Sequence, residues 1–336
     1  MRRWLVGLLL LVVMATGAAG WFVYADYQRF LDTPLRPPSP EGLYRVERGT
    51  SLERIARDLA ERGVLERPFY LQIYGRLSGQ AGRLQAGEYR IGPQTTPRRL
   101  LADMAAGRVV QYGLTVVEGW IFAELLEALR DHPRLEQTLV GLDGAAIMAR
   151  LGHPEQHPEG RFLPETYHFP AGTSDLAFLR RAHAAMAREL DRVWAERQPG
   201  LPLESPDQAL VLASIIEKET GVAGERRQIA GVFMRRLRRG MRLQTDPTVI
   251  YGLGASFDGN LRRADLEHDT PYNTYTRGGL PPTPIALPSR ASLHAAVDPA
   301  AGDALYFVAD GEGGHVFSRT LSEHNRAVRA YLRRTQ

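Results

Sequence analysis

The sequence predicts an α+β protein that an N-terminal transmembrane helix holds in a membrane. Three observations lead to this fold class. An uncharged apolar run covers residues 4–25, short strand and helix patterns alternate from 42 to 110, and a larger region from 111 to 336 mixes long helices, strands and glycine- and proline-rich loops. Hydrophobic residues make up 44% and charged residues 24% of the 336, which is typical of globular domains.

The apolar run at 4–25 is long enough to span a bilayer. Aromatic residues, which favour the membrane interface, lie near its ends: Trp4, Trp21 and Tyr24. The preceding Arg2 and Arg3 favour a cytoplasmic N-terminus, so the chain beyond the run lies outside the inner membrane. The alternative is a cleaved signal peptide, because 15–20 consists of small residues, but the run is long for one and continues past them. We expect 1–25 to be a retained single-pass anchor.

A stiff linker is expected at 26–41, because prolines are frequent there: Pro34, Pro37, Pro38 and Pro40. The region 42–110 predicts a small α+β module with strands at 44–47 and 87–91. Thr50 and Glu53 form the pattern of a capping box at the first helix, a second helix covers 68–77, and Thr96-Pro97 opens a third.

The region 111–336 predicts a larger mixed α+β domain. We expect helices at 122–130, 175–197, 206–220 and 225–239, and a last one from 321. Strand patterns lie at 304–308 and 315–317, with the glycine-rich turn of a hairpin between them. Loops fill 252–290, and 160–169 is a segment of loop and strand.

The string from Ala213 to Thr220 reads ASIIEKET and places two carboxylates and an ammonium at the end of an apolar helix. Lys218 is the one lysine in the sequence. At about 100° per residue, Glu217 shares a helix face with small neighbours, whereas Glu219 faces bulky ones. Either both acids end a salt-bridged helix, or they serve a function. Acids in the last turn oppose the helix dipole, which favours function.

An acid in an apolar setting has a raised pKa, because desolvation disfavours the charged form. Such a group can hold a proton near neutral pH and give it to a leaving oxygen, as glycoside cleavage requires. We therefore predict Glu217 as the catalytic acid of an enzyme that cuts a sugar polymer. Lys218, Glu219 and Thr220 are supporting residues, and Thr220 is placed to hold Glu217 by a hydrogen bond. A second carboxylate is not evident by spacing, and Glu159 and Glu165 are candidates.

Two later clusters combine amides, hydroxyls, a carboxylate and aromatic rings, which suit sugar binding. The predicted substrate-binding residues are Gln244, Thr245, Asp246, Tyr272, Asn273 and Tyr275, together with Glu165. The alternative is that each cluster is a loop whose polar side chains bond their own backbone. Two such loops after one buried acid favour a site.

Several other classes of function lack support in the sequence. It contains no cysteine, no HExxH spacing and no glycine-rich phosphate loop, so no metal and no cofactor are expected. No G-x-S-x-G elbow is present. The formal charge of +4 comes from scattered arginines without interleaved aromatic residues, so no nucleic-acid partner is expected.

With these residues in view, the chain resembles the endolytic murein transglycosylases, the YceG-like family. The matching strings are E-G-x-F-L-P at 159–164, ASIIEKET at 213–220, GMRLQTDPTVIY at 240–251, YNTY at 272–275, GLPP at 279–282 and YFVAD at 306–310. The segment 84–89 and its surroundings are similar to the family's LysM-like subdomain, which implies contact with peptidoglycan.

The resemblance implies a single-pass protein of the bacterial inner membrane with a periplasmic catalytic domain at 111–336. It implies endolytic cleavage of the bond between N-acetylmuramic acid and N-acetylglucosamine in nascent glycan strands, with a 1,6-anhydro end as product and Glu217 as catalytic acid. Peptidoglycan synthases are implied as neighbours. Two alternatives remain open: a hydrolytic muramidase, and a membrane-tethered scaffold that binds peptidoglycan without cutting it.

Overall fold

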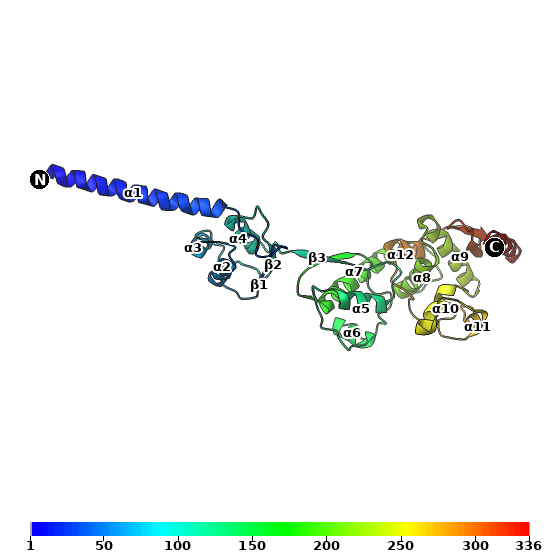
Figure 1. The fold of residues 1–336 in the computed structure, drawn as a ribbon. Coiled ribbons are helices and arrows are strands. Elements are labelled where there is room, and N and C mark those ends of the chain that lie inside the picture. Colours follow the sequence, from blue (N-terminus) through cyan, green and yellow to red (C-terminus); the bar gives the residue numbers. More distant parts are fainter. Residues whose placement is uncertain (1, 336) are drawn as a thin grey trace. The chain divides into compact units, whose positions relative to one another are not determined.

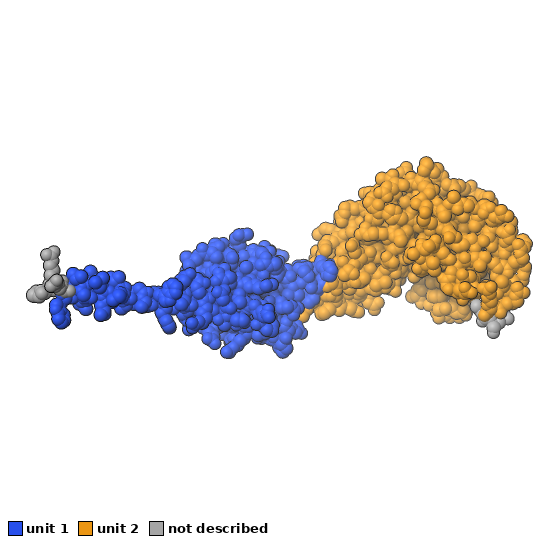
Figure 2. All heavy atoms as spheres, turned by 90° about the horizontal axis from the view of Figure 1, so that it is seen from above, with its two compact units in different colours: residues 1–112, 168–171 blue, residues 113–167, 172–336 orange. Residues whose placement is uncertain are grey.

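The computed structural model describes residues 2–335 and divides the chain into two compact units (Figures 1 and 2). The first unit comprises 1–112 with 168–171, and the second comprises 113–167 with 172–336. A separate hydrophobic core lies in each unit. The mixed α+β class predicted from the sequence is confirmed, as is the long apolar helix at the N-terminus.

The first unit is built from helices around one pair of antiparallel strands. Its elements are α1 (Arg2–Asp32), β1 (Leu43–Val46), α2 (Leu52–Glu61), α3 (Pro68–Leu77), β2 (Gly87–Arg90) and α4 (Pro97–Ala105). Strand β1 pairs with β2, with Tyr44 opposite Tyr89. Both rings are buried and pack with the apolar faces of α2 and α4, so the strand pair and the helices share one core.

Helix α1 continues beyond the apolar run and packs on the rest of its unit. An 18-residue window within Trp4–Asp32 has a mean hydropathy of 2.2, so the helix is long and apolar enough to cross a membrane. Toward its end Leu31 is only 1% exposed. The segment 26–41 therefore differs from the predicted linker, because its first seven residues are helical and Leu35 joins the core. The apolar side chains among the prolines supply the burial that holds this segment down.

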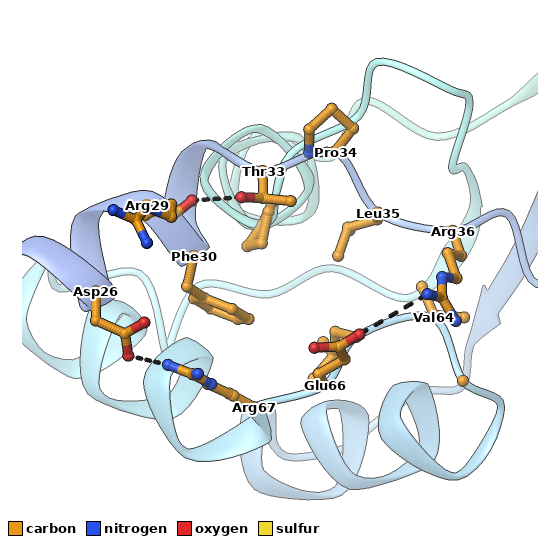
Figure 3. Close-up of a pocket in the computed structure, with 13 residues that line it drawn as sticks. Asp26, Arg29, Phe30, Thr33, Pro34, Leu35, Arg36, Val64, Glu66 and Arg67 are labelled. Carbon is orange, nitrogen blue, oxygen red and sulfur yellow. Dashed lines mark hydrogen bonds and ion pairs between the residues drawn. The ribbon is translucent and has the colours of Figure 1, made fainter.

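Polar contacts reinforce this packing (Figure 3). Asp26 pairs with Arg67 and also accepts a hydrogen bond of 3.0 Å from the Tyr70 hydroxyl. Arg98, on α4, donates to Asp32 at 3.1 Å. Between the helix end and the 63–67 loop lies a cavity of about 270 Å³. The end of α1 is thus docked on the first unit by apolar burial and by ion pairs.

Replacing Leu31 with alanine should loosen the docked helix end. Large-to-small changes at buried leucines cost about 2–5 kcal/mol. We expect the backbone amides of 26–32 to exchange with solvent faster in Leu31→Ala, as measured by hydrogen exchange of the full chain in detergent. Leu77→Ala is the matched control, because Leu77 is 79% exposed. Equal exchange in both variants would contradict the docking.

The second unit is mostly helical, with short strand pairs at its edges. Its elements are α5 (Phe122–Asp131), β4 (Leu135–Glu136), α6 (Gly144–Leu151), β6 (Thr173–Ser174), α7 (Asp175–Ala195), α8 (Pro206–Glu219), α9 (Arg226–Arg238), α10 (Asp246–Leu253), α11 (Arg263–Glu267), α12 (Arg290–Val297), β7 (Tyr306–Ala309), β8 (His315–Ser318) and α13 (Leu321–Thr335). Two further strands, β3 (Gln111–Thr115) and β5 (Thr166–Pro170), have residues in both units. Strand β3 pairs with β5, β4 with β6, and β7 with β8.

Helix α8 runs through the core of the second unit (Figure 1). Ser205 caps it by accepting a hydrogen bond from the Gln208 amide, and proline occupies its first position. Every residue from 209 to 216 is buried, against side chains of α7, α9 and α12. The core therefore determines where the polar last turn of α8 emerges.

Most of the predicted helices are present, as are the strands near 44–47 and 87–91 and the hairpin of β7 and β8, but three details differ. The cap of α2 is Ser51, one residue after the predicted Thr50, because the Ser51 hydroxyl accepts from the Arg54 amide. Two short helices differ from the loops predicted at 252–290: α10 ends at Leu253, inside this region, and α11 lies within it. Helices α6 and α12, of eight residues each, were not predicted, because so few residues carry little periodicity.

Candidate active site

Glu217 lies in the last turn of α8 and is held by the start of α12. Its Oε2 atom accepts hydrogen bonds from the Ser289 amide at 2.9 Å and from the Ser289 hydroxyl at 2.5 Å. Ser289 is itself the N-cap of α12. Among residues 2–335, no hydrogen bond reaches the other carboxylate oxygen, Oε1. One oxygen of a half-buried acid is thus fixed, and the other is free to meet a substrate.

The segment before α5 lies beside this acid. The Gly119 amide donates to the Leu287 carbonyl at 2.9 Å, and the Leu287 amide donates to the Trp120 carbonyl at 2.7 Å. The Lys218 ammonium donates to the Gly119 carbonyl at 3.2 Å. A Cβ at Gly119, whose φ is +79°, would lie 4.0 Å from the Glu217 Cγ. Segments far apart in the sequence therefore meet around the end of α8.

Glu219 faces a different part of the unit and is more enclosed. It accepts a hydrogen bond from the Thr245 hydroxyl, and Thr245 is 2% exposed. Burial raises the pKa of Glu219 to about 7; the Thr245 hydroxyl opposes the rise and the charge of Asp246 adds to it. The enclosed setting that the sequence predicts for Glu217 is thus found at Glu219, because the bulky helix face is the one the core covers.

The two polar loops come together beside Glu219. The backbone amide of Gln244 donates to the Thr274 carbonyl at 3.2 Å, and the Tyr275 hydroxyl donates to Asp246 at 2.5 Å. Burial, followed by this hydrogen bond, raises the pKa of Tyr275. Gln244 has φ +52°, which is unusual for a side chain other than glycine or asparagine. Gln244 and Asp246 are exposed, so their side chains are available to a ligand.

Two of the predicted substrate contacts form hydrogen bonds with other loop residues. Asn273 is fully buried, and its amide donates to the carbonyls of Leu266 and His268 at 3.0 and 2.7 Å. The Tyr272 hydroxyl lies 2.8 Å from the Thr283 hydroxyl. The side chain of Asn273 therefore has no exposed surface with which to meet a sugar in this conformation.

Thr220 is also engaged elsewhere. Its hydroxyl donates to Glu225 at 3.3 Å, rather than to Glu217 as predicted. His315 binds the same carboxylate through its amide and its Nδ1, each at 2.7 Å. Burial alone would raise the pKa of Glu225, but the hydrogen bonds from His315 outweigh it and lower the pKa. The β7–β8 hairpin is thereby fastened next to the end of α8.

The two candidates for a second carboxylate have separate surroundings. Glu165 is exposed and pairs with Arg290 at 3.2 Å, one residue after Ser289. Arg290 also pairs with the buried Glu189 at 2.6 Å. Glu159 is 4% exposed, and burial raises its pKa to about 7, against hydrogen bonds from the Tyr251 hydroxyl and the Phe122 amide. Neither acid hydrogen-bonds Glu217.

The arrangement suits proton transfer by a single acid. Within the described part of the chain, no three His, Cys, Asp or Glu side chains are grouped so as to hold a metal ion.

Ser289 was not predicted as a partner of Glu217. Its sequence signal is that of a helix cap, Ser289 followed by Ser292, and such a signal does not indicate which distant carboxylate the cap will meet.

Comparison with known proteins identifies the family. A model of the YceG-like family matches residues 44–330. The chain belongs to this family. A curated relative from Bacillus subtilis strain 168, named endolytic murein transglycosylase, is 32% identical over 304 residues, which cover 85% of this chain and 84% of the relative.

Two further relatives agree with this result. A protein of the same name from Streptococcus pneumoniae serotype 2, strain D39, is 26% identical over 368 residues and is matched over 96% of this chain and 64% of its own length. The 2.6 Å crystal structure of a yceG-like protein from Listeria monocytogenes has a TM-score of 0.53 at 30% identity, covering 84% of this chain and 98% of that one.

The raised pKa of Glu219 makes a prediction about stability. The folded-state pKa of about 7 lies above the ordinary value of 4.5, so the folded protein binds this proton more tightly than the unfolded chain does. Stability is therefore lost as the pH rises from about 4.5 to about 7, by at most about 3 kcal/mol. Glu219→Gln should flatten this pH dependence in thermal unfolding experiments. The same slope in variant and wild type would contradict the burial of the acid.

Proposed function

We propose that this protein is an endolytic murein transglycosylase that cuts glycan strands of peptidoglycan between N-acetylmuramic acid and N-acetylglucosamine. Membership of the YceG-like family and the names of the relatives support the reaction class. The geometry at Glu217 supports this residue as the catalytic acid. Ser289 fixes one oxygen of its carboxylate, and the other oxygen has no hydrogen bond among residues 2–335. A carboxyl group that is held in position and keeps one oxygen unbonded can give a proton to a bound substrate.

The reaction follows from one acid in two roles. Glu217, protonated on Oε1, gives its proton to the bridging oxygen, and the bond from that oxygen to C1 of the muramyl sugar breaks. The C6 hydroxyl of the same sugar then bonds to C1, and the carboxylate takes the hydroxyl proton. The product ends in a 1,6-anhydro ring. Because the nucleophile is tethered in the substrate, no second carboxylate is needed.

Neighbouring groups support both steps. The two donors of Ser289 stabilise the carboxylate formed after the first transfer, since hydrogen bonds to an ionised acceptor are strong. Lys218, through Gly119, ties the segment at 119–121 to the helix that carries the acid. Exposed Gln244 and Asp246, with Tyr275 behind them, are the proposed contacts to the glycan. Glu219, Thr245, Tyr272 and Asn273 hold the loops that present these contacts.

The location is part of the proposal. Helix α1 acts as a single-pass anchor in the bacterial inner membrane, with its N-terminus in the cytoplasm and the second unit in the periplasm. The first unit, with a LysM-like role, contacts peptidoglycan, and an open cavity of about 670 Å³ beside Arg90 and Arg108 is available for this. Peptidoglycan synthases are the proposed neighbours, because an anchored cutter works where new strands leave the membrane.

The masses of the digestion products test the reaction. Purified peptidoglycan treated with the wild-type protein should yield fragments with anhydro ends, which are one water lighter than reducing ends. Glu217→Gln keeps the shape and removes the acid, so activity should fall by about 10²- to 10⁴-fold. Reducing ends would identify a muramidase, with water as nucleophile. Full complementation of a deletion strain by Glu217→Gln would instead favour the non-catalytic scaffold.

The hydrogen bond from Ser289 provides a second test. Ser289→Ala removes the hydroxyl donor from Glu217 and should lower kcat by about 10-fold or more, because a bond to a charged group contributes about 1.5–3 kcal/mol. The substitution also removes a helix cap, which costs about 1 kcal/mol of stability. Ser174→Ala is the matched control, since Ser174 caps α7 by accepting from Ala177. An equal loss of kcat in the two variants would speak against Ser289 acting on Glu217.

A further inference from the structure

We propose that Glu159 is a positioning residue for the catalytic centre: it holds the start of α5 and Tyr251 together, and so fixes the segments that carry Gly119 and Ser289 against Glu217. The inference rests on the proposed function, because it concerns the same acid. Glu159 does not touch the reacting atoms, and its effect is transmitted through backbone contacts.

Glu159 is bound in a way that fixes its surroundings. The Phe122 amide, at the start of α5, donates to both carboxylate oxygens, at 3.0 and 3.2 Å. The Tyr251 hydroxyl donates to Oε2 at 3.1 Å. A buried carboxylate with several donors is costly to disturb, because any unmade hydrogen bond leaves a desolvated polar group. Glu159 therefore clamps α5 to α10.

The first path from Glu159 to the acid runs through the backbone before α5. Phe122 follows the segment whose Gly119 and Trp120 form two hydrogen bonds with Leu287. Leu287 lies two residues before Ser289, which donates twice to Glu217. The position of the start of α5 thus sets the position of both donors to the catalytic carboxylate.

The second path runs from Glu159 through Tyr251, on α10, to the chain that precedes Ser289. The Tyr251 ring packs edge-on against Tyr272 at 4.9 Å between centroids, and the Tyr272 hydroxyl lies 2.8 Å from that of Thr283. Thr283 precedes the segment that reaches Ser289. Gly160, with φ +78°, is so close to this segment that an added Cβ would lie 2.5 Å from the Cβ of Pro284.

The two paths close a ring. The first path joins Glu159 to Leu287, and the second joins Glu159 to Pro284. Both residues belong to the segment 284–289, which lies along α8. The Ile285 amide donates to the Ser214 hydroxyl on α8 at 3.0 Å, which completes the attachment. Removing the carboxylate breaks the hydrogen bonds to Phe122 and Tyr251, so both paths lose their attachment. A displacement of the order of 1 Å at Ser289 is enough to slow the reaction by about 100-fold.

The test compares Glu159→Ala, Glu159→Gln and Asp175→Ala in the full chain, with kcat and KM measured on purified glycan strands. We expect Glu159→Ala to lower kcat by about 10- to 100-fold with KM changed by less than about 3-fold, because Tyr275 and Thr274 still hold the proposed strand contacts Asp246 and Gln244. Glu159→Gln should recover most of kcat, since its amide oxygen can accept from Phe122 and its amino group can donate to the Tyr251 hydroxyl.

Asp175 is the matched control. It is 3% exposed, and like Glu159 it accepts from backbone amides, those of Thr138 and Leu139 at 3.0 and 3.1 Å. Asp175→Ala should leave kcat within about 3-fold of wild type. An equal loss of kcat in Asp175→Ala and Glu159→Ala, or no rescue by Glu159→Gln, overturns the proposal.

Two further results separate the possible failures. If Glu159→Ala does not fold, Tyr251→Phe removes a single hydroxyl donor from the clamp, and it should lower kcat by about 3- to 10-fold at constant KM; an unchanged kcat overturns the proposal. An inactive wild-type protein would refute the proposed function itself. An active wild type with an inactive Glu217→Gln and a fully active Glu159→Ala would refute only the positioning role.

Discussion

The burial of α8 is the constraint on which the second unit depends. Its residues from 209 to 216 are enclosed by neighbouring helices on every side, so the helix cannot rotate or slide without exposing apolar surface. The direction of each side chain in the polar last turn follows from this. Glu217 points to the cap of α12, Lys218 to the Gly119 carbonyl, and Glu219 to Thr245.

Local patterns predicted much of the fold, and the proposal of Glu217 as the acid rests on one of them. These patterns involve residues close together in the sequence, so they can be recognised in a single sequence. They are helix caps such as Thr96 and Ser205, the spacing of apolar residues, and the charges in the last turn of α8. The partners of the acids could not be predicted. Ser289 is 72 positions from Glu217 and Tyr251 is 92 from Glu159, and the packing of the core, rather than any local signal, brings them together.

The polar residues of the candidate site differ in exposure and in hydrogen bonding. Gln244 and Asp246 are exposed, whereas the side-chain amide of Asn273 donates to three carbonyl groups of a loop. Sequence alone assigned both kinds to the substrate, because amide and hydroxyl side chains look the same in either role. Burial separates them: a polar group without exposed area satisfies the backbone. The same distinction separates the half-buried Glu217 from the enclosed Glu159.

The docked end of α1 also has a mechanical consequence for the proposed role of this helix as a membrane anchor. A transmembrane helix adjusts its tilt when the thickness of the hydrocarbon layer changes. Because Asp26, Leu31 and Asp32 attach the helix to its unit without a flexible joint, the first unit must lean with it. Bilayer thickness would then be converted into the angle at which the first unit stands on the membrane.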